Sequence, residues 1–157
     1  MSEQWLIDGY NLLHALRPAD SPKTRLSREK LFALTAEFAS FKKVRTLLIL
    51  DGAGEPAQLE AYRTDHFEAV FSQKVSADAY IEKYLYEQRG KVRMTVVTND
   101  RAIANIARGG GASVLSTLQF LELLKECRAE SGDVLRKEKL RGHRFNRPFE
   151  DKLKDYE

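Results

Sequence analysis

With 157 residues, of which 43% are hydrophobic and 31% are charged, and a formal net charge of +3, the chain has the size and composition of one soluble domain with a buried core. No apolar run is long enough to span a bilayer, and the first residues lack the basic and apolar segments of a secretory signal, which excludes a membrane-spanning protein and argues against export. The single cysteine cannot form an internal disulfide, so we expect a cytoplasmic protein without a membrane partner.

Short apolar runs alternate with amphipathic segments along the chain. In chain order, the apolar runs predict strands at residues 5–8, 44–52, 67–72, 93–100 and 112–116. Apolar residues at helical spacing predict helices that start near residues 27, 76, 101 and 117. Strands that alternate with helices favour right-handed crossovers. The sequence therefore predicts an α/β fold with a central, mainly parallel sheet of four to five strands flanked by helices.

The last part of the chain differs from the rest. Its apolar periodicity fades, so residues 1–130 are interpreted as the domain and residues 131–157 as a basic C-terminal extension. Residues 136–147 include six Lys or Arg, one Glu and the aromatic Phe145, and without this segment the remaining chain would be slightly acidic. Such segregation of charge is expected when an anionic partner is held near a separate acidic pocket, although a solvated tail can have the same composition.

Aspartates mark the ends of three predicted strands. Asp8, Asp51 and Asp100 close the first, second and fourth of them, and Asp78 falls in the first turn of the helix that starts near residue 76. In a parallel sheet, strand ends that are distant in sequence become neighbours at the carboxyl edge. Converging carboxylates repel each other unless a cation lies between them, and carboxylate and amide oxygens suit Mg²⁺ or Mn²⁺. The pattern predicts a site for such an ion, which would activate water and neutralise charge on a phosphate.

Each aspartate also has a structural explanation. Asp8 before Gly9 can shape a tight turn, Asp78 can favour a helix N-terminus through the dipole, and Asp100 can cap the helix that follows it. Structural roles alone would require four separate coincidences at one edge of the sheet. The cluster is therefore a stronger indication of chemistry than any of its members.

Three segments carry a resemblance to a known family. IDGYNLLH at 7–14, SADAYIEKYL at 76–85 and VVTNDRAIANIA at 96–107 resemble, in this order, the NYN domain, a branch of the PIN-like nuclease superfamily, and within it the bacterial YacP-like family. The similarity covers roughly residues 4–127 and extends into the basic tail. It implies a PIN-like α/β sandwich and an endoribonuclease that uses Mg²⁺ or Mn²⁺ to cleave single-stranded RNA. The family's link to translation implies mRNA on the ribosome as the target.

The resemblance also implies roles for single residues. The family's first-strand acid and amide fall on Asp8 and Asn11, and two later acids fall on Asp78 and Asp100. These four form the expected catalytic set. Asp8, Asp78 and Asp100 would bind the metal, and Asn11 would hold Asp8, a metal-bound water or the phosphate in place. Asp51 matches an acid that many PIN-like proteins carry after the second strand, and it is expected as a further metal ligand.

This chain departs from the family pattern at two positions. Some NYN nucleases carry acids where this chain has Ala77 and Ala104. The thinner acidic set leaves open whether one ion or two is held. Glu82, one helical turn after Asp78, is a candidate replacement ligand.

Basic residues near the acids and in the tail are the expected substrate-binding groups. Lys74 and Arg101 adjoin the acidic residues in sequence, and the tail contributes Arg141, Arg144 and Arg147. Cationic side chains of this kind bind RNA phosphates, and an acidic pocket needs basic surroundings to attract a polyanion. We therefore expect RNA as the partner.

Two other functions stay open at this point. One is an RNA- or ribosome-binding module whose acidic site is weak or inactive. The other is a metal-dependent phosphatase for small phosphoesters, which would have no use for the basic tail. A nucleotide cofactor is not expected. The stretch GAGEPA at 52–57 matches a dinucleotide fingerprint, but it does not follow the first strand, and the charge of Asp51 would oppose a pyrophosphate.

Overall fold

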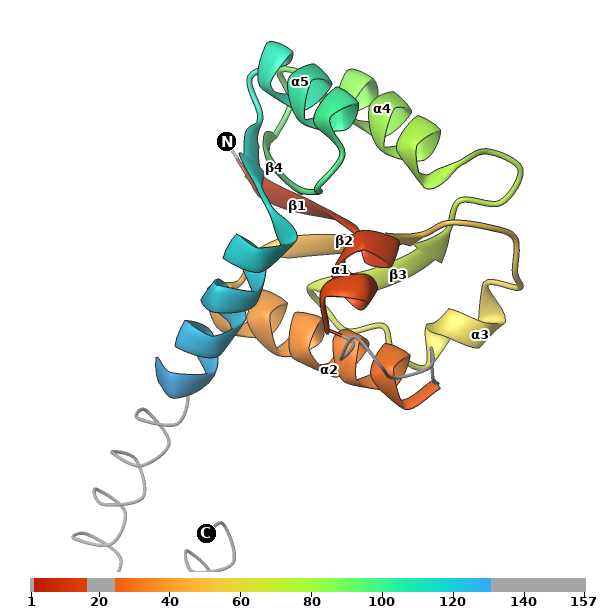
Figure 1. Ribbon diagram of the computed structural model, residues 1–157, viewed down its shortest axis with the longest axis vertical. Helices are drawn as coiled ribbons and strands as arrows, with labels where there is room; N and C mark the ends of the chain where they lie inside the picture. The colour runs from red at the N-terminus through yellow and green to blue at the C-terminus, as the bar shows by residue number, and fades with distance from the viewer. Residues whose placement is uncertain (1, 17–24, 131–157) are drawn as a thin grey trace, which may run out of the picture. The chain divides into compact units, whose positions relative to one another are not determined.

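The computed structural model describes residues 2–16 and 25–130 of the 157 (Figure 1). The chain divides into two units, residues 1–124 and 125–157. The basic segment 136–147 lies outside the described residues, as does the predicted extension 131–157 as a whole. The domain boundary near residue 130 stays a prediction.

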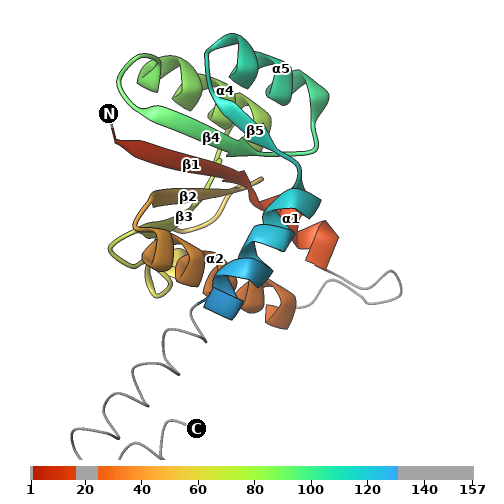
Figure 2. The ribbon, with the colours of Figure 1, turned by 90° about the vertical axis from the view of Figure 1, so that its left-hand side faces the viewer.

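A parallel sheet forms the centre of the first unit. Its strands are listed here in chain order: β1 (Glu3–Asp8), β2 (Arg45–Leu50), β3 (Phe67–Phe71), β4 (Arg93–Val97) and β5 (Ser113–Leu115). Their order across the sheet is β3-β2-β1-β4-β5, and every neighbouring pair is parallel. The predicted mainly parallel sheet is confirmed, with five strands and no antiparallel pair. Figure 2 shows the strands side by side with β1 in the middle.

Helices cover both faces of the sheet. They are, in chain order, α1 (Gly9–Leu16), α2 (Arg25–Lys42), α3 (Ala57–Glu60), α4 (Ala77–Gln88) and α5 (Arg101–Gly109), and residues 117–130 are also helical. Helices α4 and α5 lie on one face, and α1 and α2 lie on the other (Figures 1 and 2). None of the helices within the described ranges is long and apolar enough to cross a membrane.

The alternation of side chains along each strand builds two cores. Leu6 of β1, Ile49 of β2 and Val96 of β4 are fully buried in the layer that α4 and α5 cover. On the opposite face, the ring of Phe38 packs edge-on against Trp5 and Phe120, at centroid distances of 4.9 and 5.1 Å. Because successive strand residues point to opposite faces, Asp8, two positions beyond Leu6 in β1, faces the α4 side. Asp51 directly follows the last residue of β2.

Candidate active site

Asp8 is the last residue of β1 and is only 5% exposed. A tight turn was predicted after it, but helix α1 begins at once with Gly9. Glycine is required there because the chain passes very close to β2. A Cβ atom on residue 9 would lie 2.9 Å from the carbonyl oxygen of Ile49 and 2.7 Å from Cδ2 of Leu48. The turn prediction was wrong in form, since close backbone packing rather than turn geometry selects the glycine.

Asn11 holds the carboxylate of Asp8 with two hydrogen bonds. Its side-chain Nδ2 donates to Oδ2 of Asp8 at 2.7 Å, and its backbone N–H donates to Oδ1 at 3.3 Å. The second bond makes Asp8 a cap of helix α1. Burial nevertheless raises the pKa of Asp8 above the usual 3.8, against the lowering effect of these bonds, and the charge of Asp78 raises it further. Asp8 is thus a fixed and costly anion.

Asp51 follows β2 directly and is exposed. Its Oδ1 accepts a hydrogen bond of 2.8 Å from the backbone N–H of Ala77, the first residue of α4. The next backbone N–H, of Gly52, donates to the hydroxyl of buried Ser72 at 3.0 Å. Asp51 therefore fixes the start of α4 against the carboxyl end of β2.

Asp78 is the second residue of α4 and is exposed. Ser76 caps the helix by accepting a hydrogen bond from the N–H of Ala79 at 3.1 Å. Within the described part of the chain, the carboxylate of Asp78 accepts no hydrogen bond and forms no ion pair. Partial desolvation raises the pKa of Asp78, and the charges of Asp100 and Asp51 raise it further.

Asp100 does not end a strand, as the sequence had suggested. Strand β4 ends at Val97, and Asp100 caps helix α5, with its Oδ1 accepting from the N–H of Ile103 at 3.0 Å. The backbone N–H of Asp100 donates to the hydroxyl of Thr98 at 3.0 Å. The strand was predicted too long because Thr98 and Asn99 directly follow the apolar run and were counted as part of it. The structural role considered for Asp100 is real.

The sequence reasoning missed Asn99 in this loop and its partner Thr117. The side-chain amide of Asn99 donates to the hydroxyl of Thr117 at 2.8 Å, and its oxygen accepts from the N–H of Thr117 at 3.1 Å. These bonds join the β4–α5 loop to the helical segment that starts at residue 117. The only available signal was the polar triplet Thr-Asn-Asp after a buried strand.

The charge of Asp78 is close enough to those of the other three aspartates for repulsion. Its charge acts on Asp8, and the charges of Asp51 and Asp100 act on it. Among residues 2–16 and 25–130, however, no three His, Cys, Asp or Glu side chains are arranged around a common metal position. The donor chemistry, all carboxylate oxygen beside the amide of Asn11, suits Mg²⁺ or Mn²⁺. Coordination by three of these groups would require side-chain movement, for which exposed Asp78 is the freest.

The other predicted site residues lie on several parts of the chain. Lys74 is exposed in the loop before α4, and Arg101 is exposed as the first residue of α5. Glu82 is exposed one turn after Asp78 and lines a groove between α4 and α5. The remaining predicted RNA-binding residues lie outside the described residues: Arg141, Arg144 and Arg147.

Comparison with known proteins decides the family. The sequence model of the YacP-like NYN domain matches residues 5–156. The chain belongs to this family. This YacP-like NYN protein is therefore a nuclease-like protein of an RNA-related family, and the predicted PIN-like NYN fold is confirmed. A search of curated proteins gave no significant match.

Solved structures of Rae1 (YacP) from Bacillus subtilis are similar to this YacP-like NYN protein. One crystal structure is 26% identical, with a TM-score of 0.69, and the match covers 97% of this chain and 91% of that chain. A tryptophan-to-leucine mutant of the same protein is 23% identical, with a TM-score of 0.70, over 87% of this chain and 83% of that chain. The second likeness supports the fold.

Proposed function

We propose that this protein is a metal-dependent endoribonuclease that cleaves single-stranded RNA. The observation that carries the proposal is that Asp78, at the start of α4, is repelled by the charges of Asp8, Asp51 and Asp100, which follow or end β1, β2 and the β4 segment, in a chain of the NYN family. Repulsion of this kind costs free energy in the folded protein, and a bound divalent cation relieves it. A purely structural cluster would have no reason to retain it.

The proposal gives the aspartates different tasks. Asp8, Asp78 and Asp100 would hold Mg²⁺ or Mn²⁺. When bound, such an ion neutralises the charge that develops on the scissile phosphate and lowers the pKa of a coordinated water. Asn11 is a positioning residue, because both of its hydrogen bonds restrain the carboxylate of Asp8. Asp51 would act mainly by fixing the helix that carries Asp78, and its role as a direct ligand is secondary.

RNA would approach this acidic site through basic side chains. Lys74 and Arg101 are exposed beside the acids and would contact phosphates adjoining the cleavage point. The tail arginines Arg141, Arg144 and Arg147 would add contacts to RNA, either in the substrate or within a ribosome that presents an mRNA. The ribosomal setting rests on the family resemblance alone, and the proposed cytoplasmic location rests on the composition of the chain.

An RNA-binding module without catalytic activity is the second candidate. It is favoured by the capping hydrogen bonds that occupy one oxygen each of Asp51 and Asp100. A module of this kind would bind RNA with the same tail and the same family fold. It would not depend on Asp8 being a carboxylate.

One experiment separates the two candidates. Full-length protein is incubated with an end-labelled, unstructured RNA in EDTA, Mg²⁺ or Mn²⁺, beside the Asp8→Asn and Asp65→Asn variants. Asp65 is a suitable control because it is an exposed aspartate before β3, at the opposite end of that strand from the acidic site. We expect internal cleavage only with a divalent ion, and only in wild type and Asp65→Asn. RNA binding without cleavage under every condition would favour the inactive module.

A further inference from the structure

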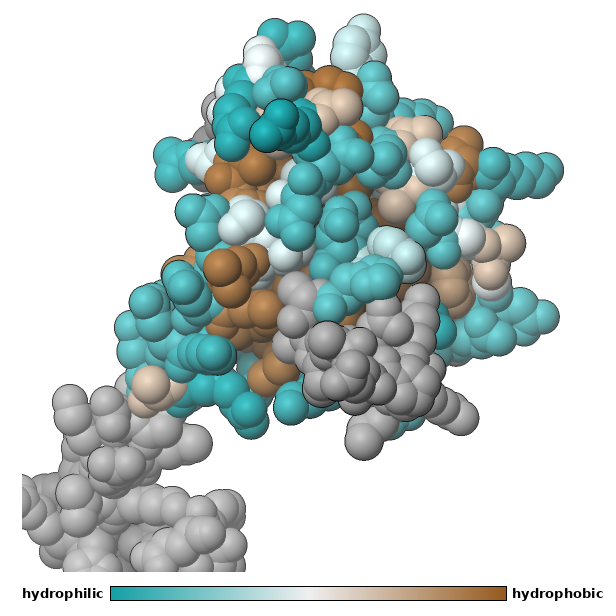
Figure 3. Space-filling model, in the orientation of Figure 1, coloured by the Kyte–Doolittle hydropathy of each residue, from teal (hydrophilic) through white to brown (hydrophobic). Residues whose placement is uncertain are grey.

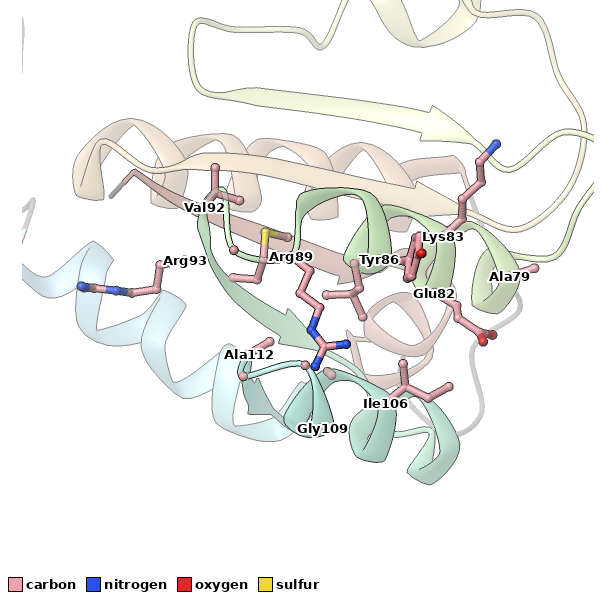
Figure 4. Close-up of a pocket in the computed structure, with 16 residues that line it drawn as sticks. Ala79, Glu82, Lys83, Tyr86, Arg89, Val92, Arg93, Ile106, Gly109 and Ala112 are labelled. Carbon is pink, nitrogen blue, oxygen red and sulfur yellow. The ribbon is translucent and has the colours of Figure 1, made fainter.

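A groove of about 670 Å³ lies between α4 and α5 (Figure 4). Its lining includes the buried side chains of Leu85, Met94 and Ala107, and it extends to the glycine run at residues 109–111. Figure 3 shows apolar residues at the surface between the two helices, among hydrophilic residues that cover them. Several of the lining residues are alanine or glycine, whose small side chains leave space between the two helices.

Two large apolar side chains stand at the rim of this groove. Tyr86 of α4 is 78% exposed, and Ile106 of α5 is 39% exposed. Both line the groove, and Figure 4 shows them on its two sides. An exposed tyrosine beside an apolar hollow offers a flat face on which a nucleobase can stack.

The charges of the lining are mostly positive. Arg89, Arg93 and Lys83 line the groove together with one acid, Glu82. In Figure 4 the guanidinium of Arg89 reaches from the end of α4 toward Gly109 on the facing helix. Among the described residues, the guanidinium of Arg89 forms no hydrogen bond or ion pair. The lining is complementary to an anion with an apolar part.

The groove runs along α4 toward the acidic site. Ala79 and Glu82 line it, and Ala79 directly follows Asp78 in the first turn of the helix. From Ala79 to Arg89 helix α4 rises about 15 Å, which is enough for a short stretch of extended nucleotides. A chain that is cut beside Asp78 could therefore continue along α4 without leaving the protein surface.

We propose that the groove between α4 and α5 is an accessory subsite for single-stranded RNA. It holds nucleotides next to the cleavage point, with a base stacked on Tyr86 and Ile106 and a phosphate bound by Arg89. This inference rests on the proposed function, because it takes RNA as the substrate. An acidic peptide would also match the arginines. The exposed ring of Tyr86 and the extension of the groove to the residue after Asp78 favour RNA.

Binding measured without catalysis tests the proposal. A fluorescent oligouridine of twelve nucleotides is titrated with full-length protein in EDTA, and its anisotropy is followed for wild type, Tyr86→Ala, Tyr86→Phe and Arg89→Ala. Arg108→Ala is the matched control, since Arg108 is an exposed arginine of α5 that does not line the groove. Tyr86 and Arg89 are both exposed, so the substitutions leave the core intact.

The expected results differ between the variants. Tyr86→Ala should weaken binding roughly tenfold through lost stacking, while Tyr86→Phe should bind like wild type. Arg89→Ala should make the slope of log affinity against log salt less negative by about 0.7. Arg108→Ala should change neither quantity. A trinucleotide, which can occupy the acidic site alone, should bind Tyr86→Ala and wild type equally.

Failure of the subsite and failure of the proposed function give different results. RNA binding is measured without metal and does not depend on catalysis. If the wild-type protein does not cleave RNA in a parallel assay, the proposed nuclease function is overturned, but the binding evidence for the groove is unaffected. Wild-type affinity of Tyr86→Ala and an unchanged salt slope of Arg89→Ala would overturn the subsite. It would also be overturned if an oligoglutamate peptide bound wild type but neither groove variant, while the RNA bound all three proteins equally, since the groove would then be a peptide site.

Discussion

Two aspartates of the candidate site, Asp8 and Asp78, differ in burial and in hydrogen bonding. Asp8 is buried at the end of β1, and both of its oxygens accept hydrogen bonds from Asn11. Asp78 is exposed at the start of α4, and its carboxylate has no hydrogen bond within residues 2–16 and 25–130. The pKa of each is raised. Asp78 repels Asp8, and it is itself repelled by Asp51 and Asp100.

The difference indicates a division of work. A buried carboxylate held by two hydrogen bonds is preorganised, so it can define where a cation sits. An exposed carboxylate without such bonds can reorient toward that cation at little cost. Substitutions of Asp8, of Asp78 or of the residues that hold them test this division.

Neutralising an acid should have the largest effect. Asp8→Asn, Asp78→Asn and Asp100→Asn should each lower divalent-dependent RNA cleavage by about a thousandfold, because each removes a charged ligand of the proposed ion. Cleavage of end-labelled RNA under single-turnover conditions measures this loss. Melting temperatures without metal should equal or exceed that of wild type, most clearly for Asp78→Asn, since a neutral isostere relieves repulsion.

The Asp65→Asn variant controls for the change of net charge. It should cleave RNA at the wild-type rate, because Asp65 is remote from the carboxyl ends of the strands. A variant of the acidic set that keeps wild-type cleavage would remove its residue from the list of essential ligands. If Asp8→Asn alone kept wild-type cleavage, Asp8 would not be the fixed ligand that defines where the cation binds.

Removing the support of Asp8 should have an intermediate effect. Asn11→Ala should reduce cleavage by roughly 10–100-fold, the usual cost of losing a group that orients a metal ligand. More Mg²⁺ should recover part of the rate, because the carboxylate itself remains. Asn105→Ala, on the exposed side of α5, is the matched control and should have no effect. An Asn11→Ala rate that no metal concentration improves would indicate a direct role for Asn11 on the substrate.

Stability should depend on pH in a direction set by the raised pKa values. A group whose pKa is higher in the folded than in the unfolded state binds more protons when folded. Its stabilising contribution is therefore full below the unfolded value, near 3.8, and is lost as the pH rises through the folded value. The metal-free protein should lose this contribution of Asp8 and Asp78 above about pH 4.

Urea unfolding at several pH values, with and without Mg²⁺, measures this dependence. The stabilisation by Mg²⁺ should be larger at pH 7 than at pH 4, because the ion binds ionised carboxylates. The Asp8→Asn variant should show a weaker loss of stability with rising pH than wild type. Identical pH profiles of the two proteins would show that burial does not perturb Asp8 as described.

The smallest effect is expected at Asp51. Asp51→Ala should lower the free energy of unfolding by about 1 kcal/mol, because the N–H of Ala77 loses its acceptor. Asp51→Asn retains an acceptor oxygen and should be nearly as stable as wild type, with a fall in cleavage of about tenfold or less. Thermal melts and cleavage rates of both variants test this. Inactivation by Asp51→Asn as complete as by Asp8→Asn would make Asp51 a principal ligand.

Much of the fold followed from local pattern. Continuous apolar runs such as residues 47–50 can be buried only between two helical layers, and their alternation with amphipathic segments requires crossovers. Helix α1 escaped prediction because Gly9 and Asn11 are poor helix formers. Its start is set instead by the cap at Asp8 and by contact with β2.

The sequence by itself determined which residue types stand after the strands, and hence that carboxylates would gather at one edge. Only the tertiary structure decided how each is held. The bond from Ala77 to Asp51, across 26 residues, and the pairing of Asn99 with Thr117 join segments that no local pattern relates. The same holds for the groove between α4 and α5. Its lining is scattered over residues 79–112, and packing alone brings those residues together. Periodicity is a property of neighbours in sequence, whereas hydrogen-bond partners and cavities depend on neighbours in space.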